Sequence, residues 1–162
     1  MVVKALDSTQ NPFSDFGNVV VGDRFIGRLD ENNAVKSRVL GKNFGNLSVI
    51  GLPRVGKTSL VYNALMVRQE SLLNEKKAAV FITMSTLGSS QALYRAIMEK
   101  TAKVIRARDE NLFQTLSDLT DSFSNTSVLE DFLFLLRRKE YRFIVILDEF
   151  DYCTKIFNVG DF

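Results

Sequence analysis

Histidine is missing from the 162 residues of this chain, and cysteine occurs once, at position 153. The absence of histidine excludes a Ser-His-Asp triad and any zinc site built on imidazole. A single cysteine cannot form a disulfide within the chain, which fits a reducing compartment, and we expect Cys153 to be a small packing residue rather than a nucleophile. The remaining enzyme classes are therefore those that work with carboxylates, hydroxyls, amines and backbone groups.

Long apolar runs are also missing. No stretch reaches the roughly eighteen residues that a membrane helix needs, and the first four residues, Met1-Val2-Val3-Lys4, are followed by polar ones, unlike a signal peptide. The net charge of +2 gives no argument for nucleic acid or membrane. Two short basic runs, Lys76-Lys77 and Arg137-Arg138-Lys139, are most simply solvated helix ends. We predict a cytoplasmic protein with no membrane partner, and nucleic acid has no support from the sequence.

The most specific motif is Gly51-Leu52-Pro53-Arg54-Val55-Gly56-Lys57-Thr58, which matches the phosphate-binding loop G-x-x-x-x-G-K-[ST] in full. In such a loop, backbone N–H groups converge on a phosphate at the positive end of the following helix. Lys57 would neutralise the β- and γ-phosphates as a catalytic residue, and Thr58 would bind Mg²⁺. The alternative is a glycine turn before a helix with an exposed lysine. The predicted phosphate-binding residues are Gly51, Pro53, Arg54, Val55, Gly56, Lys57, Thr58 and Ser59.

A second motif ends the apolar run from Arg142 to Leu147, where Asp148 and Glu149 follow at once. Such a run suits a strand buried on both faces of a parallel sheet. In P-loop enzymes a carboxylate at this point holds the water shell of Mg²⁺, and a second one polarises the attacking water. We assign these roles to Asp148 and Glu149 respectively. The alternative is an acidic pair that caps the next turn, and Asp151 either assists the metal or caps a helix near Tyr152.

The segments Asn11-Pro12-Phe13, Gly17, Val20 and Phe25-Ile26-Gly27-Arg28 precede the two motifs above. Together with those motifs they carry a resemblance to the "archaeal-type" ATPases of the STAND and AAA+ branch of P-loop proteins. It implies that Phe25, Ile26 and Gly27 line the adenine pocket, and that Arg28 braces this segment or approaches the phosphates. It also implies that the nucleotide is ATP, with which the absence of an Asn-Lys-x-Asp guanine motif agrees. The alternative for these residues is a turn with an apolar anchor before a helix.

The predicted fold is α/β, a doubly wound parallel sheet with helices on both faces. Residues 1–22 are expected to form an extended arm and residues 23–162 the ATPase domain. Strands are predicted at 46–50, 78–83 and 142–148. Helices are predicted at 29–40, with Gly41 ending the first, at 57–73 and 89–105, over the apolar positions from Leu112 to Phe123, and after a capping box at Ser127-Val128-Leu129-Glu130. We expect the phenylalanine-rich stretch from Phe123 to Phe134 to be buried, and the alternative is that it faces a partner.

The resemblance also implies that a further strand lies between the strand at 46–50 and the one ending at Asp148, and that a γ-phosphate sensor, a helical lid and an arginine finger follow. None of these has a counterpart in the sequence given. Without that strand the sheet would keep an open slot in its middle, so we expect this chain to be the N-terminal piece of a longer polypeptide or half of a split protein completed by another chain. We also expect a homo-oligomer or a C-terminal partner that completes the sheet. The alternative is a self-contained ATPase. A hydroxyl from Thr83 or Ser85 is a candidate neighbour of the γ-phosphate.

Together these features predict an ATP-binding and ATP-hydrolysing switch domain that uses Mg²⁺ and binds ATP and its product ADP. The family resemblance implies oligomer-forming signalling or defence roles. The alternative is a scaffold that binds nucleotide without hydrolysing it and recruits an effector or DNA. A P-loop kinase is a third option, which the adjacent acidic pair makes less favourable because it suits water as the acceptor.

Overall fold

The computed structural model describes residues 18–157, and the chain falls into two units, Met1–Val67 and Arg68–Phe162. Each unit has its own buried core. The predicted family residues Asn11-Pro12-Phe13 and Gly17, and most of the predicted arm at 1–22, lie outside the described residues.

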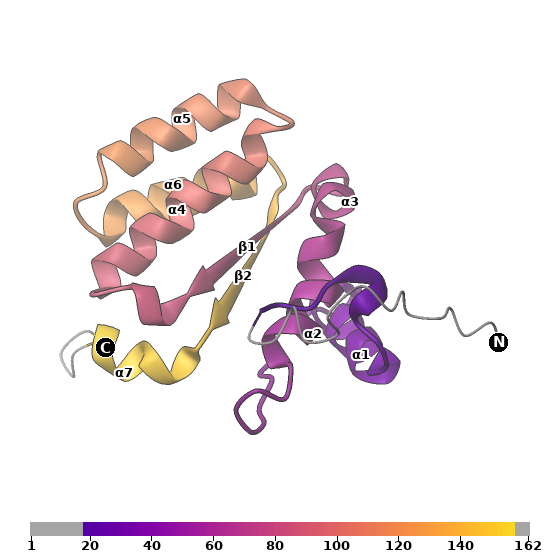
Figure 1. Cartoon of the computed structure of the whole chain (residues 1–162). Coiled ribbons are helices and arrows are strands. Elements are labelled where there is room, and N and C mark those ends of the chain that lie inside the picture. Colours follow the sequence, from indigo (N-terminus) through magenta and orange to yellow (C-terminus); the bar gives the residue numbers. More distant parts are fainter. Residues whose placement is uncertain (1–17, 158–162) are drawn as a thin grey trace, which may run out of the picture. The chain divides into compact units, whose positions relative to one another are not determined.

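The first unit contains two α-helices joined by the long segment that carries the P-loop sequence (Figure 1). A short 3-10 helix, η1 (Gly22–Arg24), precedes α1 (Leu29–Leu40), and α2 (Lys57–Leu65) follows the loop. Helix α1 has the predicted bounds, and the N–H of Gly41 donates to the carbonyl oxygen of Ser37 at its end, 3.1 Å away. The core of this unit is small. It consists of Val35 with the buried face of α2, namely Leu60, Ala64 and Leu65.

The predicted strand at 46–50 is wrong. These residues form no regular element, and the side chains of Leu47 and Ile50 are 44% and 91% exposed. A strand exists only when a neighbouring strand satisfies its backbone groups, and the one sheet of the described residues does not include this segment. Instead, the carbonyl oxygen of Asn46 accepts a hydrogen bond from Nε of Arg38 at 3.2 Å. The apolar pattern of Leu47 to Ile50 therefore indicates a propensity to form a strand, but the segment has no strand beside it to pair with among the described residues.

The helix predicted from Lys57 to Leu73 is interrupted. After α2 come the 3-10 helix η2 (Met66–Arg68) and then α3 (Gln69–Asn74), which belongs to the second unit. Each of the two helices still buries an apolar side chain of the predicted stretch, Leu65 on α2 and Leu72 on α3, at 2% and 3% exposure.

The second unit is built around a parallel pair of strands, β1 (Lys77–Thr83) and β2 (Arg142–Asp148), both close to their predicted bounds. The register pairs Lys77 with Arg142 at one end and Thr83 with Asp148 at the other. Three helices connect them: α4 (Ser90–Arg106), α5 (Glu110–Asp121) and α6 (Thr126–Arg138). Figure 1 shows these helices stacked together beside the sheet, and α3 contacts β1.

Short elements complete the second unit at the carboxyl ends of the strands. The 3-10 helix η3 (Met84–Thr86) follows β1, and η4 (Phe150–Tyr152) and α7 (Cys153–Ile156) follow β2. Asp151 makes no side-chain cap to either η4 or α7, so its predicted capping role is wrong. Cys153 packs against a cluster that contains Ile82, Met84 and Ile156, as expected of a packing residue.

The outer edge of β1 is closed by side chains. Successive residues of a strand direct their backbone N–H and C=O groups to opposite sides. The N–H of Arg142 donates to the carbonyl oxygen of Lys76 at 2.7 Å, so the backbone groups of Lys76 face β2. Those of every second residue from Ala79 onward therefore face away from β2. Their carbonyl oxygens accept hydrogen bonds from Gln69, Lys100 and Thr86 at 3.2, 2.7 and 2.8 Å. Side-chain donors thus occupy the positions that another strand would need.

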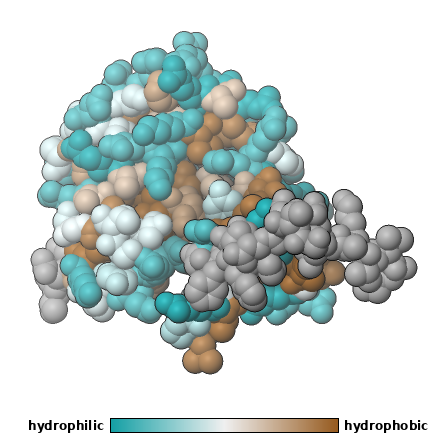
Figure 2. Space-filling view, viewed as in Figure 1, coloured by the Kyte–Doolittle hydropathy of each residue, from teal (hydrophilic) through white to brown (hydrophobic). Residues whose placement is uncertain are grey.

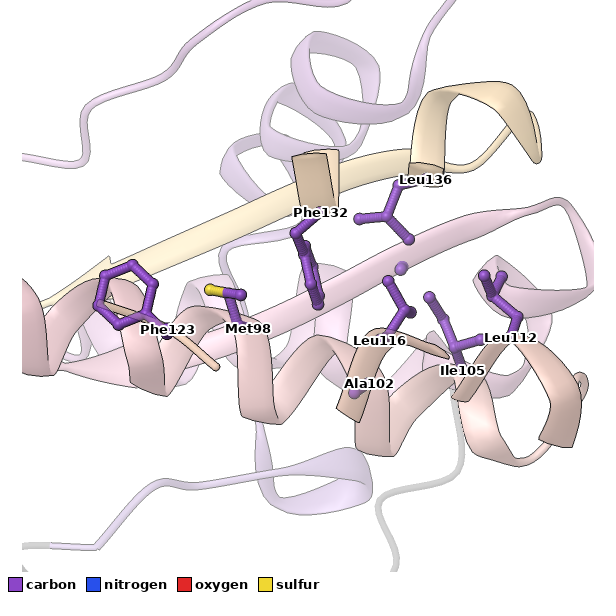
Figure 3. Close-up of a cluster of buried hydrophobic side chains, with 9 residues drawn as sticks. Met98, Ala102, Ile105, Leu112, Leu116, Phe123, Phe132 and Leu136 are labelled. Carbon is purple, nitrogen blue, oxygen red and sulfur yellow. The ribbon is translucent and has the colours of Figure 1, made fainter. Parts of the chain in front are cut away.

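The main core lies between the three connecting helices and the sheet. Figure 3 shows its side chains converging from α4, α5 and α6. Phe132 of α6 is fully buried in this cluster, at 0% exposure, with Met98 and Ile105 of α4 and Leu116 of α5. Phe123 is also buried, but Phe134 is 62% exposed and Leu133 is 38% exposed, so the predicted burial of this phenylalanine-rich stretch holds only in part.

The predicted capping box at Ser127 is also wrong. Helix α6 begins at Thr126, and its N-cap is Asn125, whose Oδ1 accepts the N–H of Ser127 at 2.9 Å. Asn and Ser cap helices about equally well, so the earlier residue in a compatible backbone conformation takes the position. Ser127 lies inside the helix.

The described residues are therefore a mixed α/β structure, as predicted at that level. Within residues 18–157, no helix is long and apolar enough to span a bilayer.

Candidate functional site

The candidate residues form two groups, one in each unit. The first group surrounds the loop from Gly51 to Thr58, and the second lies at the carboxyl ends of β1 and β2.

The loop of the first unit ends in a glycine-capped helix. Gly56 is the N-cap of α2 and has φ of 81°, a left-handed conformation that costs a residue with a side chain about 1–2 kcal/mol. Its carbonyl oxygen accepts the N–H of Leu60 at 2.9 Å, the first hydrogen bond of the helix. Arg54 is left-handed too, with φ of 62°. The second glycine of the motif is thus required by the backbone that connects the loop to α2.

Backbone donors gather at this helix start. The N–H groups of Arg54, Val55 and Gly56 donate to none of the described residues, and Pro53 has no N–H. The first turn of any α-helix leaves further N–H groups without a partner inside the helix. The loop is exposed from Gly51 to Val55, and Figure 2 shows hydrophobic residues protruding where it lies. Free N–H groups beside the positive end of a helix are the elements of an anion-binding site.

Lys57 folds back onto its own loop. Its Nζ donates to the carbonyl oxygens of Gly51 and Leu52, each at 2.9 Å. An ammonium group has three donors, so one remains for another acceptor in this arrangement. The same bonds hold the first and seventh residues of the motif together and set the size of the loop.

Arg28 braces the loop from the preceding segment. Its Nη1 donates to the carbonyl oxygen of Val55 at 2.9 Å, and its Nε lies 3.6 Å from Oε1 of Glu31. This contact joins Arg28 to the phosphate loop, and the two predicted roles of Arg28, bracing its own segment or approaching the phosphates, stay predictions. The predicted adenine-pocket residues differ in exposure: Phe25 is half-buried, whereas Ile26 is 87% exposed and Gly27 has φ of 81°.

Asn63 is a structural residue that sequence reasoning missed. Its side-chain Nδ2 donates to the carbonyl oxygen of Val20 at 2.6 Å, and its Oδ1 accepts the N–H of Gly22 at 2.9 Å. One turn earlier, the hydroxyl of Ser59 accepts the N–H of Val20 at 3.0 Å. Ser59 is therefore buried and holds the segment that precedes α1, and its predicted contact with the nucleotide stays a prediction. An asparagine within an otherwise apolar helix face was the signal available in the sequence.

In the second unit, the strand register places Thr83 beside Asp148 at the carboxyl edge of the sheet. Two residues after Thr83, the hydroxyl of Ser85 donates a hydrogen bond to Oε2 of Glu149, the residue after Asp148. Glu149 has φ of 55°, which turns the chain sharply out of β2, and its carbonyl oxygen accepts the N–H of Tyr152 at 3.0 Å. Asp148 is half-buried and Glu149 exposed.

This edge therefore carries two carboxylates and two hydroxyls within two paired strand ends. All four supply oxygen donors, the ligand type that Mg²⁺ takes, and an exposed carboxylate can accept a proton from water. Asp151 follows on η4 and is exposed. Among the described residues, no three Asp, Glu, Cys or His side chains gather closely enough to hold a metal ion by themselves. The metal role of Asp148 and the base role of Glu149 stay predictions.

Comparison with known proteins identifies no relative of this chain. No family model matches the chain, and neither a curated protein nor a solved structure matches it.

Proposed function

We propose that this chain is an ATP-binding and ATP-hydrolysing switch domain of the STAND/AAA+ kind, built on the doubly wound P-loop fold. The observation that carries the proposal is the loop before α2. A complete phosphate-loop sequence coincides there with a left-handed glycine at the helix start and with backbone N–H groups of Arg54, Val55 and Gly56 that donate to none of the described residues. Both features support an anion-binding site at this loop.

Lys57 would neutralise charge on the β- and γ-phosphates. Its ammonium has one donor left while it holds the carbonyl oxygens of Gly51 and Leu52, and the flexible side chain can exchange these bonds for stronger ones to phosphate. Thr58, next in the chain, would contribute its hydroxyl to Mg²⁺. The metal would supply charge neutralisation on the phosphate oxygens.

The carboxylates at the end of β2 support hydrolysis rather than binding alone. In the proposed reaction, the oxygen of a water molecule bonds to the γ-phosphorus while the bond from that phosphorus to the β,γ-bridging oxygen breaks, which releases ADP. Glu149 accepts the proton that the water loses. Asp148 would hold the water shell of Mg²⁺. Ser85 fixes one oxygen of Glu149, which leaves the other for the attacking water.

ATP would then act as the ligand of a conformational switch. Groups ordered around the γ-phosphate lose that partner on hydrolysis, so ATP and ADP favour different arrangements. We propose that the change alters assembly with further copies of the chain or with a partner that completes the sheet.

The test compares Glu149→Gln with Asp151→Asn, a matched loss of one carboxylate two residues away. We expect Glu149→Gln to lower ATP turnover by at least about 100-fold, the usual contribution of a general base, and to bind Mg-ATP as the unchanged protein does. Asp151→Asn should change neither quantity. If the unchanged protein binds Mg-ATP but its turnover equals that of Glu149→Gln, the chain is a nucleotide-dependent scaffold instead.

A further inference from the structure

Three turns of the second unit meet at the edge of the sheet opposite to the carboxylates. Parallel strands have their amino ends at one edge, and helices that return the chain between such strands end there too. The turn from α3 to β1 contains Lys76, the turn from α4 to α5 contains Arg108, and the turn from α6 to β2 contains Lys139. The Nζ of Lys76 donates to the carbonyl oxygen of Lys139 at 3.1 Å, which joins two of the turns directly.

A hollow of about 540 Å³ opens between these turns. Its lining is rich in hydrogen-bond donors and consists of Leu73, Asn74, Lys76, Arg108 and Tyr141. The two basic residues in this lining come from turns that are 32 positions apart in the chain, so the concavity is a product of the fold.

Positive charge is concentrated around the hollow. The segments 75–77, 106–110 and 137–142 hold eight Lys or Arg residues and four Asp or Glu residues, a net charge of +4, whereas the whole chain has +2. The rest of the chain is therefore net negative. Opposite charges on one molecule are expected to orient an anionic partner towards this edge.

The four acidic residues of these segments are already engaged. Glu75 pairs with Lys77, whose hydrogen bond and charge lower the pKa of that carboxyl, and Glu110 pairs with Arg106. Glu140 lies 3.5 Å from Nζ of Lys76, and Oδ1 of Asp109 accepts the N–H of Leu112.

Within residues 18–157, four exposed cations of these segments form no ion pair: Arg108, Arg137, Arg138 and Lys139. Arg138 lies over the ring of Phe134, 6.0 Å from its centroid, so Arg108, Arg137 and Lys139 have neither a carboxylate nor a ring as a partner. Favourable interaction with the helix dipole explains a basic residue in the last turn of a helix, such as Arg137. It does not explain Arg108, which lies beyond the end of α4.

We infer that this edge binds the phosphodiester backbone of nucleic acid, with one phosphate at the hollow between Lys76 and Arg108 and its neighbours on Arg137 and Lys139. Guanidinium groups bind phosphate oxygens through paired hydrogen bonds, and ammonium groups add point charges. The contacts involve no arrangement that reads a base, so binding is independent of sequence.

Exposed apolar residues decide between nucleic acid and a membrane surface. Peripheral membrane binding combines basic residues with apolar side chains that enter the lipid. The large exposed hydrophobic residues of the described chain include none from 73–77, 106–110 or 137–142. A concave, polar and basic edge without apolar anchors fits a phosphate chain.

The experiment measures binding of a fluorescein-labelled duplex of mixed sequence, about twenty base pairs long, by fluorescence anisotropy across a salt series. The test variant combines Arg108→Gln, Arg137→Gln and Lys139→Gln. The matched control combines Lys36→Gln, Lys42→Gln and Lys155→Gln, which changes the net charge equally at positions outside the edge. Thermal melting by circular dichroism checks that each variant folds.

Three phosphate contacts predict that affinity falls about 40-fold between about 50 and 200 mM salt, because each contact contributes roughly 0.9 to the log-log slope. The test variant should lose at least about tenfold in affinity at the lower salt and most of the slope, whereas the control should retain both. If the triple variant does not fold, the three single substitutions replace it, and each should reduce the slope by about one.

Equal losses in the test and control variants would overturn the inference, because they would show attraction to net charge alone. So would failure of the unchanged protein to bind the duplex, including the case in which it binds inorganic polyphosphate or phosphatidylserine vesicles instead.

Discussion

Ser85 and Glu149 are joined side chain to side chain by a hydrogen bond, although 64 positions separate them in the chain. The parallel register of β1 and β2, which pairs Thr83 with Asp148, makes this contact possible. Ser85 is a positioning residue in our account, because it acts on the proposed base and does not touch the substrate.

Replacing Ser85 by Ala should lower the turnover number for ATP several-fold and leave the KM for ATP within about twofold. Without the hydroxyl, the Glu149 side chain regains rotamer freedom, and restricting such a side chain costs on the order of 1 kcal/mol, equivalent to roughly fivefold in rate. Steady-state ATPase kinetics measure both quantities. Ser85→Thr keeps a hydroxyl and should restore the turnover number. A Thr variant as slow as the Ala variant would argue against this role.

Gly56 gives a second prediction, which concerns the backbone of the loop. An added Cβ would lie 3.8 Å from Nη1 of Arg28, so there is room for it, but the left-handed φ is strained for any residue with a side chain. Gly56→Ala should therefore reduce the free energy of unfolding by about 1–2 kcal/mol. It should also weaken ATP binding, since relief of the strain rotates the adjacent N–H groups.

Gly88→Ala is the matched control for this substitution. Gly88 has no heavy atom within 4 Å of an added Cβ, and its φ is not in the left-handed range. The free energy of unfolding of Gly88→Ala, measured in urea, should be unchanged or slightly raised. Equal stabilities of the two variants would contradict the argument for Gly56.

The start of α6 provides a third prediction. Asn125→Ala removes the acceptor of the Ser127 N–H and should destabilise the protein by about 1 kcal/mol. Ser127→Ala leaves that bond intact and should have little effect. Urea unfolding of both variants measures the difference, and the opposite order would mean that the helix begins with the capping box at Ser127.

The strands and helices that were predicted correctly are those whose neighbours are supplied within the same unit. The runs at 78–83 and 142–148 pair with each other, so their apolar pattern became strands. The run at 46–50 has similar residues but no strand beside it among those described, and pattern alone does not supply one. Strand prediction from a single sequence thus depends on a partner that the local pattern does not reveal.

The candidate site was predictable to the extent that it follows from local motifs. The phosphate loop and the carboxylates at 148 and 149 are contiguous in the chain, and the sequence identifies them. The contacts of Arg28 with Val55, of Asn63 with Val20 and of Ser85 with Glu149 join distant segments and depend on packing. The same limit applies to the basic edge, because Lys76, Arg108 and Lys139 belong to three separate turns.

The most direct test of the central claim is equilibrium binding of a fluorescent ATP analogue with Mg²⁺ to the purified chain, to Lys57→Ala and to Lys36→Ala as a matched lysine control. Hydrogen bonds to charged groups contribute about 1.5–3 kcal/mol, so Lys57→Ala should bind about 10- to 150-fold more weakly. Lys36→Ala, on α1, should bind as the unchanged protein does. Two results would contradict the assignment of the loop as a nucleotide site. One is that Lys57→Ala binds the analogue as tightly as the unchanged protein does. The other is that the unchanged protein folds cooperatively but does not bind the analogue at all.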